Sequence, residues 1–117
     1  GIVPRRRFRF EAKRLRDAAS RRSYLGKDGL GCFLDGRYAK EDSIAGMLGY
    51  VQKDSLEGQA RRVAGSLQAA PENYAVVAEG QWREVAVVRE LSTFRSIHSR
   101  KRPLGPITLL HTFLLFC

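Results

Sequence analysis

The sequence is short of cysteine, of acidic residues and of long apolar runs. Cys32 and Cys117 are its only cysteines, and two isolated cysteines make neither a disulfide framework nor a four-ligand zinc site. The apolar segment at residues 109–117 is too short to cross a bilayer. No apolar run follows the N-terminal arginines, so no secretory signal is visible. We therefore expect a cytoplasmic protein with no membrane partner.

Basic residues outnumber acidic ones. The 117 residues include 21 lysines and arginines against 12 aspartates and glutamates, a net charge of +9. Arginine supplies most of the positive charge, and its planar guanidinium suits phosphate. Nucleic acid is therefore the first partner to consider, with DNA favoured over RNA. The alternative is a basic surface that only prevents aggregation. The length and the 44% apolar content fit one small domain over residues 1–117.

Residues 7–15 alternate between apolar and charged side chains, which predicts a half-buried strand. One face would carry Phe8, Phe10 and Ala12. The other would carry Arg9, Glu11, Lys13 and Leu15. Residues two apart on a strand point the same way, roughly 6.5–7 Å apart. We therefore expect Glu11 and Lys13 to stand side by side.

This pair has a chemistry of its own. A carboxylate such as Glu11 binds Mg²⁺, or Mn²⁺ in its place, through hard oxygen atoms. A neighbouring lysine such as Lys13 orients water or offsets charge that builds on a phosphate. Together they are parts of a site for metal-assisted phosphodiester hydrolysis. The alternative is an amphipathic strand whose charges only maintain solubility, because E-x-K spacing is common by chance.

The next elements read as helices. Apolar residues recur at helical spacing over residues 44–51, where Asp42 or Ser43 would be the N-cap. A second helical pattern follows an Asp54–Ser55 cap and ends before Pro71. Residues 18–23 read as a polar connection, and residues 24–35 as a short helix or an irregular turn.

The C-terminal part reads mainly as strands. Residues 74–78 predict a short strand, and residues 82–91 a strand by their β-branched content, although a helix remains open. Residues 93–100 and 107–116 predict an antiparallel pair, the second being apolar on both faces like a central strand. The order of elements predicts a two-layer α+β domain, with helices packed on one face of a mixed β-sheet.

Candidate nucleic-acid contacts surround the first strand. Arg7, Arg9, Arg14 and Arg16 would form a basic cluster around Glu11. On the later strand, His98 and Arg100 share a face and could contact phosphate. The alternative for His98 is a structural histidine with a hydrogen-bonded ring. His111 reads as a satisfied core histidine, because it shares a face with apolar residues.

The segment Phe10-Glu11-Ala12-Lys13-Arg14-Leu15, followed by helices and strands, resembles the second half of the PD-(D/E)XK nuclease superfamily. The runs at residues 24–39 and 45–51 also resemble uncharacterised bacterial proteins often taken for restriction-like or phage-defence factors. These segments cover about half of the chain. The resemblance implies a restriction-endonuclease-like core, with Glu11 as a Mg²⁺ ligand and Lys13 as the charge-stabilising lysine.

The superfamily places another acidic ligand on an earlier strand, whereas none of the ten residues before Glu11 is acidic. We therefore expect the chain to be the C-terminal part of a longer nuclease-like domain, or to be completed by a partner chain or a second copy; the alternative is that the site is dead. Alone, it should show little or no nuclease activity. Two alternatives remain: a non-catalytic DNA- or RNA-binding module, and a subunit of a phage-defence complex whose apolar C-terminal strand a partner covers.

Overall fold

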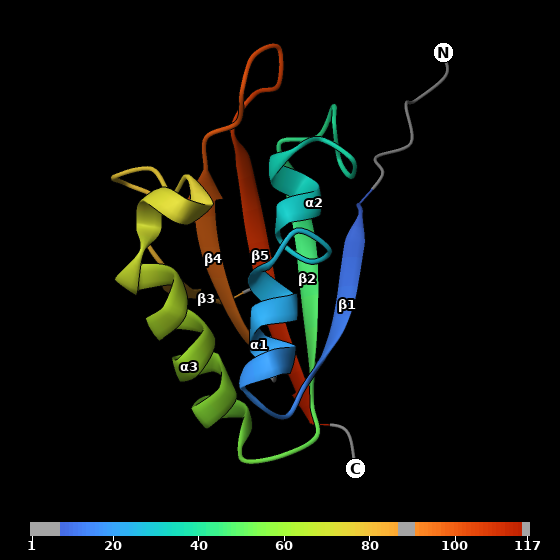
Figure 1. The fold of residues 1–117 in the computed structure, drawn as a ribbon, viewed down its shortest axis with the longest axis vertical. Coiled ribbons are helices and arrows are strands. Elements are labelled where there is room, and N and C mark those ends of the chain that lie inside the picture. The colour runs from blue at the N-terminus through green and yellow to red at the C-terminus, as the bar shows by residue number, and fades with distance from the viewer. Residues whose placement is uncertain (1–7, 87–90, 116–117) are drawn as a thin grey trace.

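The computed structural model describes residues 8–86 and 91–115. They form an α+β fold with a five-stranded mixed sheet and helices, as expected (Figure 1). In chain order the elements are β1 (Phe10–Leu15), α1 (Ala18–Leu25), α2 (Gly31–Leu34), β2 (Ile44–Val51), α3 (Leu56–Ala69), the 3₁₀ helix η1 (Pro71–Tyr74), β3 (Arg83–Val85), β4 (Ser92–His98) and β5 (Ile107–Leu115).

The sheet has the strand order β1-β2-β5-β4-β3. Its first half is parallel, because β1 pairs with β2 and β2 pairs with β5 in the same direction. Its second half is antiparallel, from β5 through β4 to β3. The predicted antiparallel pair of C-terminal strands is thus confirmed, and β5 is the central strand of the five.

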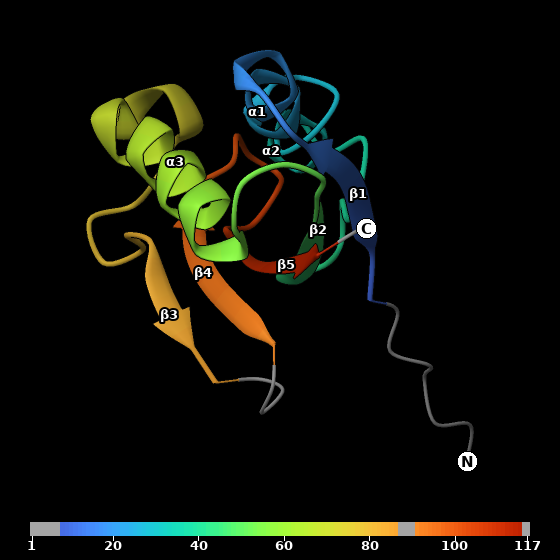
Figure 2. The ribbon, with the colours of Figure 1, turned by 90° about the horizontal axis from the view of Figure 1, so that it is seen from below.

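All three α-helices lie on one side of the sheet, as predicted (Figure 2). The core lies between the two layers, and alternate strand residues enter it from the sheet. From β2 and β5 these include Met47, Leu109 and Phe113, which are no more than 1% exposed. From the helical layer they meet Tyr24 and Phe33, each 0% exposed.

The helix predicted over residues 44–51 is wrong, because this segment is strand β2. Its two glycines explain the difference. A Cβ on Gly46 would come 2.6 Å from the Phe10 ring, and one on Gly49 would come 2.6 Å from Leu15 and 2.8 Å from Phe113. The glycines therefore make room for side chains of the neighbouring strands. A parallel strand flanked on both sides is apolar throughout, so its pattern also satisfies helical spacing.

The polar connection predicted over residues 18–23 is also wrong, because helix α1 begins at Ala18. Its N-cap is Asp17, whose carboxylate accepts a hydrogen bond from the Ser20 amide while the Ser20 hydroxyl contacts the Asp17 backbone. This reciprocal cap satisfies amides that otherwise have no partner at the start of a helix. Only the end of α1 is buried, at Tyr24 and Leu25, so its sequence shows no apolar stripe.

Other expectations are met in part. Helix α3 has the predicted extent, and its N-cap is Ser55, which accepts a hydrogen bond from the Gly58 amide at 2.9 Å. The strand predicted over residues 74–78 is reduced to a single bridge between Val76 and His98. Of the strand predicted over residues 82–91, β3 covers three residues, and residues 87–90 lie outside the described part of the chain. Among the described residues, none of the helices has the length and apolar character needed to cross a membrane.

Candidate functional site

Glu11 and Lys13 project from the same face of edge strand β1, as predicted. In register they stand beside Met47 and Gly49 of β2, and therefore on the helix-covered side of the sheet. The Lys13 Nζ lies 3.6 Å from the Glu11 Oε1, and the two side chains are 25% and 18% exposed. The carboxylate and the ammonium group thus form a partly buried ion pair at the rim of the core.

The predicted basic cluster is divided between two faces. Arg9 places its guanidinium 4.1 Å from the centre of the Tyr38 ring, a cation–π contact. Arg14 is paired in register with Tyr50 and so points to the opposite side of the sheet from Glu11. Arg16 is exposed just beyond β1. Arg7 lies outside the described residues, so the structure does not place it.

The Arg100 side chain links backbone segments that are far apart in the sequence. Its guanidinium donates hydrogen bonds to four backbone carbonyls at distances of 2.6–3.3 Å. These carbonyls belong to Phe33, Ala39, Asp42 and Gly105. The Arg100 guanidinium is therefore bound to the protein's own backbone, and Arg100 is not part of the proposed nucleic-acid surface.

His98 belongs to a buried chain of hydrogen bonds that the sequence pattern did not reveal. The Tyr24 hydroxyl contacts His111 Nδ1 at 2.8 Å, and His111 Nε2 contacts the Ser96 hydroxyl at 2.8 Å. The Ser96 hydroxyl contacts His98 Nε2 at 2.7 Å, and His98 Nδ1 contacts the Tyr74 carbonyl at 2.6 Å. The four side chains are 0% exposed, so the expectation of a satisfied core histidine at His111 is confirmed.

The Tyr74 carbonyl at one end of this chain of hydrogen bonds determines which atom donates each of them. A carbonyl only accepts, so His98 Nδ1 must donate to Tyr74. A neutral His98 then accepts from the Ser96 hydroxyl through Nε2, and Ser96 accepts from His111 Nε2. His111 Nδ1 is left to accept from the Tyr24 hydroxyl. The pattern assigns the Nδ1–H tautomer to His98 and the Nε2–H tautomer to His111.

Burial also sets the charge of these groups. It lowers the pKa of His98, although the hydrogen bond to the Tyr74 carbonyl acts in the other direction. It lowers the pKa of His111 well below the usual histidine value, and proximity to His98 lowers it further. Burial raises the pKa of Tyr24. A serine beside a histidine is a nucleophile only where a substrate reaches its hydroxyl. Since Ser96 is 0% exposed, this chain of hydrogen bonds serves the core.

The described residues do not fit a complete site for Mg²⁺. They contain no group of three or more histidine, cysteine, aspartate or glutamate side chains placed to hold a metal ion. Glu11 contributes one carboxylate, and the ammonium group of Lys13 lies beside it. Mg²⁺ binds through one or two carboxylates, several waters and substrate phosphates in octahedral geometry. Glu11 would supply one of these carboxylates.

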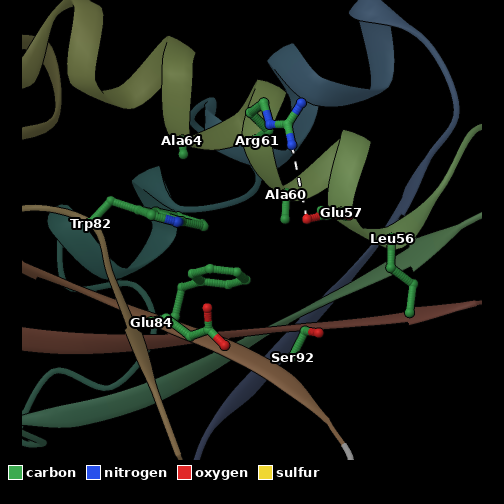
Figure 3. Close-up of a pocket in the computed structure, with 9 residues that line it drawn as sticks. Leu56, Glu57, Ala60, Arg61, Ala64, Trp82, Glu84 and Ser92 are labelled. Carbon is green, nitrogen blue, oxygen red and sulfur yellow. Dashed lines mark ion pairs between the residues drawn. The ribbon is translucent and has the colours of Figure 1, made fainter.

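A separate cavity of about 490 Å³ lies at the other edge of the sheet, between α3 and the β3–β4 pair (Figure 3). Its wall includes the Trp82 ring, which stacks on Phe94 with 5.2 Å between ring centres. Glu57 faces it from α3, where it pairs with Arg61 at 3.9 Å. The width of the sheet separates this cavity from the Glu11–Lys13 pair.

Comparisons with protein-family models, with curated proteins and with solved structures found no match to this chain.

Proposed function

We propose that the chain is a nuclease-like nucleic-acid-binding domain in which Glu11 and Lys13 form part of a site for metal-dependent phosphodiester hydrolysis. The observation that supports this function is their placement side by side on β1, with 3.6 Å between ammonium and carboxylate. Each side chain keeps some exposure, 18% for Glu11 and 25% for Lys13, so a ligand at the sheet edge can reach both groups.

In this proposal the sheet and its helices are a restriction-endonuclease-like core. Glu11 supplies one oxygen ligand, and Lys13 offsets the charge on the phosphate under attack. The second acidic ligand comes from outside the described residues. The chain by itself is therefore expected to bind nucleic acid without cleaving it.

Binding is tested first, on the 117-residue chain. Fluorescence anisotropy with duplex DNA between about 50 and 200 mM salt should show affinity falling steeply as salt rises, because cations on the protein replace counterions on DNA. Arg16→Gln should reduce the log–log salt slope by about 1. Arg61→Gln is the matched control, since Arg61 is exposed on α3 near the opposite edge. Affinity independent of salt would refute the nucleic-acid role.

Catalysis is tested on protein expressed from the complete reading frame that encodes this chain. With Mg²⁺ and plasmid DNA, Glu11→Gln and Lys13→Met should abolish cleavage while DNA binding stays within twofold. Lys53→Met, a change at an exposed lysine between β2 and α3, should cleave like the unchanged protein. Equal cleavage by the unchanged protein and both site variants would exclude these residues from the chemistry.

The second candidate is a non-catalytic DNA- or RNA-binding module. The observation in its favour is the missing ligand set, because the described residues hold no cluster of three potential metal ligands. This candidate predicts the same salt-dependent binding, no cleavage under any metal condition, and no effect of Glu11→Gln in either assay.

A further inference from the structure

Within residues 8–86 and 91–115, no second layer covers the side of the sheet opposite the helices, and the parallel half of this side is largely apolar. Alternation along β2 and β5 places Ile44, Leu48, Leu110 and Leu114 on this side. Phe10 of β1 joins them and is 51% exposed, and Ile44 is 41% exposed. No described helix covers these residues, since α1, α2 and α3 all lie on the other side (Figure 2). Parallel strands are almost always covered on both faces, so this face is suited to a second covering layer.

The charged residues that the described strands place on the same side are all positive. Arg14 of β1, Arg95 of β4 and Arg83 of β3 point to it, and none of the described strand residues that share this side is acidic. None of the three arginines has a carboxylate partner among the described residues. Arg83 and Arg95 are also direct register partners, and like charges in that position repel. An anionic occupant would relieve this repulsion.

The width and the length of this face match those of a short α-helix. The arginines of β1 and β4 lie on either side of the apolar strands β2 and β5, separated across the sheet by three strand spacings, about 14 Å. Arg14 is level with Leu114 and Arg95 with Leu110, so the two are also offset by about 13 Å along the strands. An α-helix with its side chains is about 10–12 Å across. The open-side residues of β5, from Thr108 to Leu114, run for about 20 Å, the length of three to four helical turns.

We propose that this open face, made by Phe10, Ile44, Leu48, Leu110 and Leu114 between Arg14 and Arg95, is the seat of an amphipathic helix from a partner polypeptide, apolar along one stripe and acidic along both flanks. The undescribed stretches hold at most seven residues, too few for three turns of helix, so the occupant does not come from these 117 residues. A second copy is disfavoured, because two such faces would bring arginines against arginines. Nucleic acid would satisfy the arginines but would leave the leucines without an apolar partner.

The test uses a fluorescent helical peptide of about 14 residues with a leucine stripe and glutamate flanks. One control peptide carries lysines in place of the flanking glutamates, and a second has the leucine stripe scrambled. The acidic amphipathic peptide should bind the 117-residue chain at 1:1, at least tenfold more tightly than either control. Leu110→Thr and Leu48→Thr, which keep strand-forming residues, should weaken it at least tenfold, and Arg14→Gln with Arg95→Gln at least fivefold. Glu11→Gln and Arg61→Gln should leave it unchanged, which separates this surface from the proposed nuclease site.

Three results would overturn the proposal. The first is equal binding of the three peptides, or no binding. The second is a dimer in sedimentation equilibrium that Leu110→Thr abolishes, which would assign the face to a second copy. The third is a single-stranded oligonucleotide that binds the same face and loses affinity in the leucine variants. Circular dichroism and thermal unfolding of each variant confirm that the fold is retained.

Discussion

At the scale of single residues, Gly49 makes room in the sheet for side chains of the two neighbouring strands. Gly49 lies between Leu15 and Phe113, which occupy the space that a Cβ would take. It thereby lets side chains of β1 and β5 meet across β2. The position is closed to larger residues by neighbouring side chains that are themselves buried.

Gly49→Ala should lower the free energy of unfolding by about 1–3 kcal/mol, because the added methyl group overpacks the core. Urea denaturation measures the change. Gly65→Ala is the matched control in helix α3, where a Cβ meets nothing within 4 Å. It should raise stability by about 0.5–1 kcal/mol, since alanine is the better helix former. A neutral Gly49→Ala would show that Leu15 and Phe113 are free to move aside.

Arg100→Lys should lower the free energy of unfolding by roughly 2 kcal/mol, because one ammonium group cannot reach the four carbonyls that the guanidinium ties together. Arg102→Lys, at an exposed position in the same segment, should change little in the same urea titration. If Arg100 instead contacts phosphate, the substitution will weaken DNA binding and leave stability intact.

At the scale of elements, helix α3 depends on the cap at its first turn. Ser55→Ala should lower the free energy of unfolding by about 1 kcal/mol, because the Gly58 amide loses its side-chain acceptor. Ser55→Asp should restore most of the loss. Ser66→Ala, at an exposed position inside the helix, is the control. Equal urea midpoints for Ser55→Ala and the unchanged protein would exclude a capping role.

Strands β1, β4 and β5 and helix α3 are the elements predicted correctly. In β1 the alternation is as predicted, but the apolar residues Phe8 and Phe10 are 40% and 51% exposed, and Glu11 and Lys13 lie on the side that faces the helices. Strand β1, helix α3 and strand β4 each show a single clear period, so the alternation that places Glu11 beside Lys13 was visible in the sequence. Strand β2 is apolar at nearly every position, so period 2 and period 3.6 fit it equally well. The chain of hydrogen bonds that links Tyr24, His111, Ser96 and His98 was not predictable, because these bonds join residues up to 87 positions apart in the sequence.

At the scale of the whole molecule, the two buried histidines couple stability to pH. Burial lowers the pKa of His98 and of His111, whereas both have the ordinary value of ~6.5 in the unfolded chain. As the pH falls below ~6.5, the two histidines bind protons in the unfolded state but stay neutral in the folded state. The free energy of unfolding should therefore fall, by up to about 1.4 kcal/mol per pH unit for each histidine.

Urea titrations at about pH 7.5, 6.5 and 5.5 measure this effect above the range where carboxylates titrate. His98→Gln should show a shallower decline than the unchanged protein. Nitrogen-15 NMR should find His98 as the Nδ1–H tautomer and His111 as the Nε2–H tautomer at neutral pH. A stability that stays flat across this range would mean that the histidines are not held neutral in the folded state.

The central position of β5 has a consequence for the order in which the protein folds. This strand joins β2 to β4, yet it is the last of the five to leave the ribosome. A growing chain that lacks it has no bridge between the parallel and antiparallel halves. Since the pairing of β2 with β5 spans 64 residues of sequence, we expect it to form late and slowly. During that interval the apolar side chains of β2 remain accessible to chaperones and to other nascent chains.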